Sequence, residues 1–320
     1  MKPDSSIYVA GHRGLVGSGL VRALQRKGHG NLVLRTHAEL DLTDRRAVEQ
    51  FFHAEKPEVV FVAAARVGGI LANNTYPAEF IRDNLEIHID VIHQAWCHGV
   101  RRLIYFGSSC IYPRECPQPI KEEYILTGPL EPTNSAYAVA KLAGLEMCRA
   151  YNQQHGTHYL GVMPTNLYGP GDNYDPQTSH VLPALIRKIH EAKTRGDKEV
   201  VIWGSGKSRR EFLHVDDLAE ACVMLASLDD ATYQAQIGAW RYPLVNVGCG
   251  KDQTITELAR TVAQAVGFRG ELRYDATKPD GTPQKLLDIS RISKLGWTPR
   301  IGLPAGIAAT YRTALDEKIF

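Results

Sequence analysis

The chain has 320 residues, enough for one large α/β unit or two modest domains with well-filled cores. Its 37 basic and 35 acidic residues nearly cancel, which argues against nucleic acid or a membrane surface as a partner. The six cysteines form no Cys-x-x-Cys pair and no histidine spacing suits zinc, so we expect no metal site and a reducing, cytoplasmic compartment. No stretch approaches 18 unbroken apolar residues, so we expect no membrane span.

Short apolar, β-branched runs alternate with helical patterns through the first half of the chain. We expect the strands at residues 7–10, 32–34, 59–64, 103–106 and 159–163. Such alternation is typical of parallel strands that are joined by crossover helices. The sequence therefore predicts an α/β fold with a Rossmann-type, doubly wound parallel sheet, whose ligands bind at the carboxyl ends of the strands.

The regular alternation of strand and helix patterns ends after residues 163–176, a loop rich in Gly, Pro, Asn and Asp. A helix at about 181–192 and strands at 200–204, 244–248 and 271–276 follow without a steady repeat. We therefore expect a smaller, interleaved C-terminal substrate domain. The predicted division gives residues 1–170 and about 215–250 to a cofactor-binding domain, and residues 171–214 and about 251–320 to a substrate-binding domain.

A glycine-rich loop joins the first strand to an amphipathic helix. Its spacing is Gly-x-x-Gly-x-x-Gly, and glycine leaves out the Cβ atoms that would block a pyrophosphate from the backbone N–H groups at the helix start. An ordinary strand-to-helix turn is the alternative, but the position between strand and helix favours a dinucleotide. The predicted cofactor-binding residues of the loop are Gly11, His12, Arg13, Gly14, Leu15, Val16 and Gly17.

The end of the second strand indicates which dinucleotide is bound. A site that prefers NAD usually has a carboxylate there for the ribose hydroxyls, but this chain has Arg35. Arg35 together with Arg13 can neutralise a 2′-phosphate, which favours NADP(H), although both arginines can also be plain solvated residues. Asp41 and Leu42 are expected near the adenine, and Ala64 is expected beside the cofactor after the third strand.

Tyr137 and Lys141 are four residues apart, on one face of a predicted helix. Hydride transfer to a ketone leaves an alkoxide that needs a proton, and a tyrosine can supply it when a nearby ammonium stabilises its phenolate. Lys141 can also hold the nicotinamide ribose, and Ser108 at the tip of the fourth strand can donate a second hydrogen bond to the substrate oxygen. A surface tyrosine and lysine are the alternative interpretation.

The glycine loop with Ser108, Tyr137 and Lys141 resembles the extended short-chain dehydrogenase/reductase family, whose members mostly act on nucleotide sugars. Many relatives that dehydrate sugars carry Asp-Glu after a Thr at the position of Ser108. This chain has Ser109 and Cys110 there, which argues against a 4,6-dehydratase.

Cys110 follows Ser108 by two residues, so both side chains share one face if the strand stays extended. A free cysteine is usually a packing residue. In a cleft that holds a 4-keto sugar, however, the ketone acidifies the hydrogens on carbons 3 and 5, and a thiolate can remove them. A second group must return protons from the opposite face, and His180, at the start of a helix, is the candidate.

Over nearly its whole length, the chain resembles the GDP-L-fucose synthase branch of that family. The motifs that carry this resemblance are GHRGLVGSG, AAARVGGILANNTYPAEFI, GSSCIYP, LEPTNSAYAVAK, MPTNLYGPGDN, TSHVLPALI, REFLHVDD and KPDGTPQKLLD. The resemblance implies an NADPH-dependent 3,5-epimerase and 4-reductase acting on a GDP-sugar, GDP-4-keto-6-deoxy-D-mannose. It implies that Cys110 and His180 are base and acid for epimerisation, and that Ser108, Tyr137 and Lys141 serve the reduction.

The same resemblance implies further contacts. Pro164 and His180 are expected near the cofactor. The expected substrate-binding residues are Asn166, Lys188, Trp203, Arg210 and Lys285. Helices at about 77–97 and 135–154 are expected to pair across a homodimer.

Three alternatives stay open at this point. A GDP-mannose 3,5-epimerase that retains NAD and a GDP-colitose synthase that acts on a 3-deoxy ketone share the scaffold. A non-catalytic NADP-sensing module would keep the glycine loop alone, and the intact set of Ser108, Tyr137 and Lys141 argues against it.

Overall fold

A computed structural model describes residues 1–176, 178–278 and 280–320. Its largest element is a six-stranded sheet with the order β2-β1-β3-β4-β5-β9, in which every neighbouring pair is parallel. The chain changes direction across the sheet between β1 and β3, which is where such sheets open a crevice. The strands are β1 (Ile7–Ala10), β2 (Leu32–Val33), β3 (Val59–Val62), β4 (Arg102–Phe106), β5 (His158–Pro164) and β9 (Leu244–Val247).

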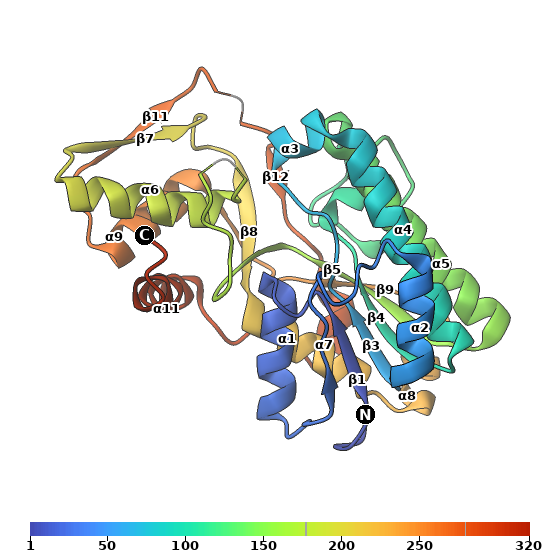
Figure 1. Cartoon of the computed structure of the whole chain (residues 1–320). Coiled ribbons are helices and arrows are strands. Elements are labelled where there is room, and N and C mark those ends of the chain that lie inside the picture. Colours follow the sequence, from blue (N-terminus) through green and yellow to red (C-terminus); the bar gives the residue numbers. More distant parts are fainter. Residues whose placement is uncertain (177, 279) are drawn as a thin grey trace.

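Helices cover both faces of this sheet (Figure 1), which confirms the predicted doubly wound fold. One face packs on α2 (Arg45–Glu55), α4 (Pro77–Cys97) and α5 (Ser135–His155). The other packs on α1 (Leu15–Arg26) and α7 (Val215–Ala226). Both faces are buried, so β1, β3 and β4 have no exposed residue, and β1 and β3 appear in the sequence as unbroken apolar runs.

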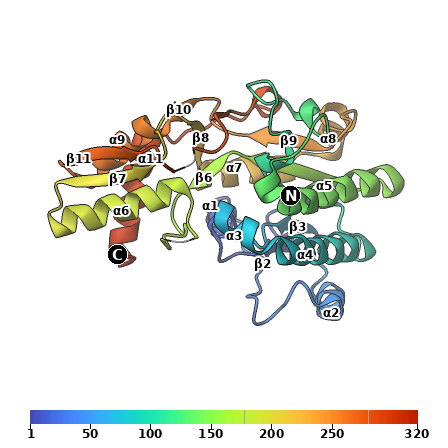
Figure 2. The same ribbon diagram turned by 90° about the horizontal axis from the view of Figure 1, so that it is seen from above.

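The remaining elements form a second layered unit beside the large sheet (Figure 2). Its central strand β8 pairs in parallel with β12 and β6 and antiparallel with β10, while β7 and β11 form a separate parallel pair. A third apolar cluster joins β6, β7, β8 and β11 to three helices. The elements are β6 (Asn166–Tyr168), α6 (Val181–Arg195), β7 (Glu199–Trp203), β8 (Arg209–His214), β10 (Asp252–Thr254), α9 (Ile255–Val266), β11 (Glu271–Asp275), β12 (Gln284–Lys285) and α11 (Leu303–Asp316).

Short helices fill the connections between these units. They are α3 (Ile70–Thr75), α8 (Asp230–Gln236), α10 (Ser290–Lys294) and the 3-10 turns η1 (Ser109–Ile111), η2 (Glu122–Tyr124) and η3 (Pro132–Asn134). Within the described ranges, no helix combines the length and apolar character that crossing a membrane requires.

Candidate active site

The glycine loop between β1 and α1 folds tightly on itself. Gly11 has a φ of +78°, and a Cβ atom built on it would lie 2.8 Å from the Ala64 backbone nitrogen. A Cβ on Gly17 would lie 2.1 Å from the Gly11 carbonyl oxygen. Gly14 caps α1 without any side-chain hydrogen bond, so the first N–H groups of the helix are left for a ligand. This arrangement fits a pyrophosphate group.

The other predicted residues of the loop lie around this cradle. Leu15 and Val16 form the half-buried first turn of α1, and Arg13 is exposed. The His12 Nδ1 atom is buried and has no hydrogen-bond partner in the described part of the chain. A buried polar atom without a partner is costly, so a ligand that supplies one fits this position.

Arg35 follows β2, as expected for a residue that would face a 2′-phosphate. Its guanidinium, however, is already paired with a carboxylate. Its guanidinium forms an ion pair with Glu55 and donates a hydrogen bond to the Leu34 carbonyl at 2.8 Å. It also lies 5.8 Å from the centre of the Phe51 ring. A cofactor phosphate would therefore share Arg35 with the Glu55 carboxylate.

The predicted adenine contacts differ in exposure. The Asp41 carboxylate accepts hydrogen bonds from the Thr43 backbone N–H at 2.9 Å and from its hydroxyl at 2.8 Å, and these lower its pKa. Leu42 is buried in the apolar cluster that underlies α2. Ala64 lies beside Gly11, and Pro164 is the half-buried last residue of β5.

The extended strand expected through Ser108 and Cys110 is wrong. The strand β4 ends at Phe106, and residues 109–111 form the 3-10 turn η1, so strand alternation does not continue through Cys110. Ser108 caps this turn instead, and its hydroxyl oxygen accepts the Cys110 backbone N–H at 3.4 Å. A cap of this kind is a local side-chain contact that competes with an extended strand.

Tyr137 and Lys141 lie on the first turns of α5, close to the end of β4. The Lys141 side chain is 2% exposed, and its Nζ atom donates a hydrogen bond to the Phe106 carbonyl at 2.8 Å. The same atom lies 5.7 Å from the centre of the Tyr137 ring. Burial lowers the pKa of Lys141 to about 8 and raises that of Tyr137. The structure thus brings together an amine and a phenol, and burial favours the neutral form of both.

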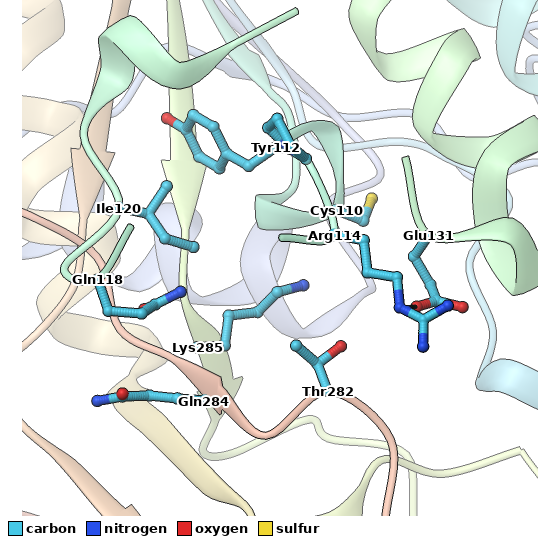
Figure 3. A pocket seen from close by; sticks show the side chains of 10 residues that line it. Cys110, Tyr112, Arg114, Gln118, Ile120, Glu131, Thr282, Gln284 and Lys285 are labelled. Atoms are coloured by element: carbon cyan, nitrogen blue, oxygen red, sulfur yellow. Dashed lines mark ion pairs between the residues drawn. The ribbon is translucent and has the colours of Figure 1, made fainter. Parts of the chain in front are cut away.

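Cys110 lines a pocket that also holds Lys285 (Figure 3). The Lys285 side chain extends from β12 in the direction of Cys110, and Arg114 and Glu131 form an ion pair at 3.4 Å on another wall. Burial raises the pKa of the Cys110 thiol, and the positive charge of Lys285 and the hydrogen bond with Ser108 act against this. The thiol is therefore buried beside groups that favour its thiolate.

Arg210 and Asn166 belong to the same small sheet as Lys285. In the register of β12 and β8, Lys285 is the partner of Arg210. Arg210 donates a hydrogen bond to the Arg209 carbonyl at 2.8 Å, and burial lowers its pKa. Asn166 donates its amide N–H to the Glu211 carbonyl at 2.8 Å, which fixes the orientation of its side chain.

His180 caps α6 and is exposed, and reduced solvation by the surrounding protein lowers its pKa. The preceding loop lies against α3, because a Cβ on Gly69 would be 3.8 Å from the Thr178 carbonyl oxygen. Helix α3 in turn packs on η3, which ends three positions before Tyr137. His180 and Cys110 are thus on separate elements, and in the described ranges no hydrogen bond joins them.

Two predicted substrate residues are exposed. Lys188 lies on α6 two turns beyond His180, and Trp203 ends β7 with 71% of its side chain exposed. The Lys278 Nζ atom lies 5.6 Å from the centre of the Trp203 ring. An exposed indole of this size is a stacking surface rather than a core residue.

Two buried groups near the site were not predicted from the sequence. The Glu211 carboxylate is fully buried and accepts the backbone N–H groups of Gly250 at 2.6 Å and Leu287 at 3.0 Å, which ties β8 to both neighbouring segments. Its place directly before the apolar pair Phe212 and Leu213 was a weak signal. His88 on α4 is also fully buried and lies 3.5 Å from the Lys141 Nζ atom, and its helical pattern gave no signal.

Comparisons with known proteins place these observations in one family. Residues 7–238 match the model of the NAD dependent epimerase/dehydratase family. A protein of Arabidopsis thaliana named putative GDP-L-fucose synthase 2 is 56% identical over 100% of this chain and 94% of its own length. The GDP-L-fucose synthase of Escherichia coli K12 is 50% identical over 98% of this chain and 97% of its own. The solved structure of a GDP-L-fucose synthetase from Naegleria fowleri bound to NADP is 26% identical, with a TM-score of 0.86 and coverage of 100% and 96%.

Proposed function

The chain belongs to the NAD dependent epimerase/dehydratase family, and we propose that it is an NADPH-dependent enzyme that forms GDP-L-fucose. It inverts carbons 3 and 5 of GDP-4-keto-6-deoxy-D-mannose and reduces carbon 4. The observation that carries the proposal is the position of Cys110, in one pocket with Lys285 and next to the turn where Lys141 meets β4. A thiol for proton transfer and a phenol for reduction then serve the same ketone.

The glycine loop is the proposed cofactor site, because Cβ atoms at Gly11 and Gly17 would fill the space that the backbone needs. Arg13 and Arg35 would meet the 2′-phosphate, and Ala64 would pass beside the cofactor. When bound, NADPH supplies the hydride that reduces carbon 4.

In the reduction, Tyr137 donates its phenolic proton to the oxygen on carbon 4 as that oxygen gains negative charge. Lys141 stabilises the phenolate that is left, and Ser108 donates a hydrogen bond to the same oxygen. The half-buried position of Tyr137 supports this role, because burial raises its pKa and keeps the phenol protonated until the oxygen needs the proton.

In the epimerisation, the Cys110 thiolate removes the proton from one carbon next to the ketone, and the electron pair forms an enolate. His180 then donates a proton to the opposite face, which inverts that carbon. Cys110 now carries a proton and His180 has lost one, so exchange with water restores both before the other carbon reacts. Lys285 supports the first step because its positive charge favours the thiolate.

We assign the GDP end of the substrate to the second unit. Arg210 and Lys285 would meet the diphosphate or sugar, with Lys188 further along α6. Asn166 offers its amide oxygen, and the exposed Trp203 ring offers an apolar face near the guanosine. Residues 1–170 and about 215–250 would then hold the cofactor, and residues 171–214 and about 251–320 the GDP-sugar.

Two further parts of the proposal concern assembly and compartment. Exposed apolar side chains on α4 and α5, among them Ile89 and Val139, support pairing of these helices in a homodimer. All six cysteines are free thiols, which supports a cytoplasmic enzyme.

The test is a reaction of the enzyme with NADPH and the 4-keto GDP-sugar, followed by NADPH absorbance and by NMR of the product. We expect one NADPH to be consumed for each sugar, with carbons 3, 4 and 5 all changed. Inversion without NADPH loss would indicate an epimerase that retains its cofactor. Faster turnover of the 3-deoxy ketone would indicate a colitose synthase, and no reaction with either ketone would leave only a module that senses NADP.

A further inference from the structure

A buried histidine lies behind the amine of the proposed site. His88 on α4 has no exposed surface, and its ring is enclosed between α4, α5 and β4. Its Nδ1 atom lies 3.2 Å from the Ala140 carbonyl oxygen, and its Nε2 atom lies 3.5 Å from the Lys141 Nζ atom. The ring thus contacts the backbone of α5 on one side and the Lys141 amine on the other.

These two contacts fix the tautomer of His88. The Ala140 carbonyl only accepts, so the Nδ1 atom carries the proton and donates it. Burial and the positive charge of Lys141 hold the pKa of His88 well below its usual range, so the ring is neutral and its Nε2 atom has a free lone pair. The Lys141 ammonium only donates, and its N–H group fits this lone pair.

Tyr105 on β4 completes the enclosure without competing for that lone pair. Its hydroxyl oxygen lies 3.3 Å from Nδ1 and 3.4 Å from Nε2 of His88. A phenol has a single proton, and Tyr105 donates it to the Lys141 carbonyl oxygen at 3.2 Å, so it has none to donate to the Nε2 lone pair. A Cβ on Gly144 would lie 2.5 Å from this hydroxyl, so α5 needs a glycine where Tyr105 approaches.

We propose that His88 is a positioning residue for the reduction, in which its Nε2 lone pair accepts an N–H group of the Lys141 ammonium and sets the direction of the amine. The proposal rests on the proposed function, because it assigns Lys141 to the reduction. Two acceptors, the Phe106 carbonyl at 2.8 Å and His88 at 3.5 Å, then take two of the three ammonium protons. The third ammonium proton is then available for an interaction with Tyr137.

The His88 acceptor also favours the charged form of the buried Lys141 amine. Burial lowers the pKa of Lys141 to about 8, so the amine is only partly charged near that pH. The groups that face it are His88 from α4, Tyr105 from β4, Cys110 from η1 and Tyr137 from its own helix. Of these, neutral His88 offers its ring lone pair as a hydrogen-bond acceptor to the charged amine. Without that acceptor, Lys141 loses its proton at a lower pH.

The first test replaces His88 with Phe, which keeps the ring volume but has no acceptor, and with Gln, whose amide oxygen can accept in its place. We expect H88F to reduce the ketone about 10- to 100-fold more slowly at pH 8, because hydrogen bonds to charged groups are strong. The alkaline limb of its pH profile should move to lower pH by up to about one unit. H88Q should recover most of both changes.

Two comparisons separate positioning from a general structural effect. Deuterium uptake at carbons 3 and 5 of the ketone is assigned to Cys110 and His180. At about pH 6, where Lys141 stays charged in both proteins, this uptake should stay within about twofold in H88F. The variant H93F changes another histidine of α4, whose Nδ1 atom contacts the Tyr151 hydroxyl at 2.8 Å. It should leave the pH profile of the reduction unchanged. Equal losses of uptake and reduction, or an unshifted H88F profile, would overturn the proposal.

The second test does not depend on turnover. In the unaltered, ¹⁵N-histidine-labelled protein, NMR should show the His88 ring as a neutral Nδ1–H tautomer across pH 6 to 9. An Nε2–H tautomer or a charged ring would refute the assignment, because neither offers a lone pair to Lys141. If the unaltered enzyme does not reduce the 4-keto sugar with NADPH, the proposed function fails instead, and the tautomer result still stands by itself.

Discussion

Replacing Gly17 with Ala is the sharpest test of the proposed cofactor cradle. The added Cβ would lie 2.1 Å from the Gly11 carbonyl oxygen and 2.7 Å from both the Gly11 carbonyl carbon and the His12 Cα. Carbon atoms normally approach to about 3.5 Å, so the overlap is close to 1 Å, and every atom involved belongs to the backbone. The start of α1 must therefore move away from the loop. We expect a stability loss of about 1–3 kcal/mol and at least a 100-fold weaker affinity for NADPH.

Two other glycines provide matched controls. A Cβ on Gly14 would lie an ordinary 3.5 Å from the Gly11 carbonyl oxygen, so G14A should keep its stability. It should still weaken NADPH binding, because the second glycine of such a loop lets the backbone approach the pyrophosphate. Gly30 has no atom within 4 Å of its Cβ position, so G30A should change neither property. NADPH fluorescence titration and thermal unfolding measure both quantities. Wild-type NADPH affinity in G17A would refute the cradle.

Other predictions concern pH, cofactor choice and packing. Burial raises the pKa of Glu122 from 4.5 to about 7, so the folded state holds a proton that the unfolded state releases. The free energy of unfolding should therefore fall by roughly 3 kcal/mol as pH rises through that window. E122Q should flatten this slope in denaturant titrations, because its amide oxygen still accepts the Asn246 N–H; an unchanged slope would contradict the assignment. R35A should raise the KM for NADPH about 10-fold and leave that for NADH unchanged, whereas equal changes would exclude a phosphate contact. G144A should lower stability by about 1–3 kcal/mol, since its Cβ would overlap the Tyr105 hydroxyl; a neutral result in thermal unfolding would show that the ring can move.

The sequence was most informative where one physical cause determines the pattern. The strand β1 was predicted at 7–10 and is found at Ile7–Ala10, because a strand buried on both faces must be apolar throughout. The glycine loop was readable for a similar reason. Its spacing reflects close approaches of backbone atoms, which the contacts at Gly11 and Gly17 bear out.

The features that were not predicted depend on contacts between distant residues, or on competition between a local side-chain cap and an extended strand. The turn η1 replaces the end of a strand because Ser108 caps it, and the apolar pattern before it does not show where the extended backbone stops. The ion pair of Arg35 with Glu55 joins the loop after β2 to α2 and has no periodic signature. His88 looks like any residue on the buried face of α4, and only the fold shows that Lys141 lies against it.

The central claim is that Cys110 carries the proton chemistry and that Tyr137 with Lys141 carries the reduction, in one site. The most direct measurement is NMR of the 4-keto sugar in deuterated water with C110S and with the unaltered enzyme, with and without NADPH. We expect C110S to lose deuterium uptake at carbons 3 and 5 while it still consumes NADPH and forms some product that is reduced but not epimerised. Unchanged deuterium uptake in C110S would contradict the account, because Cys110 would then not be the base.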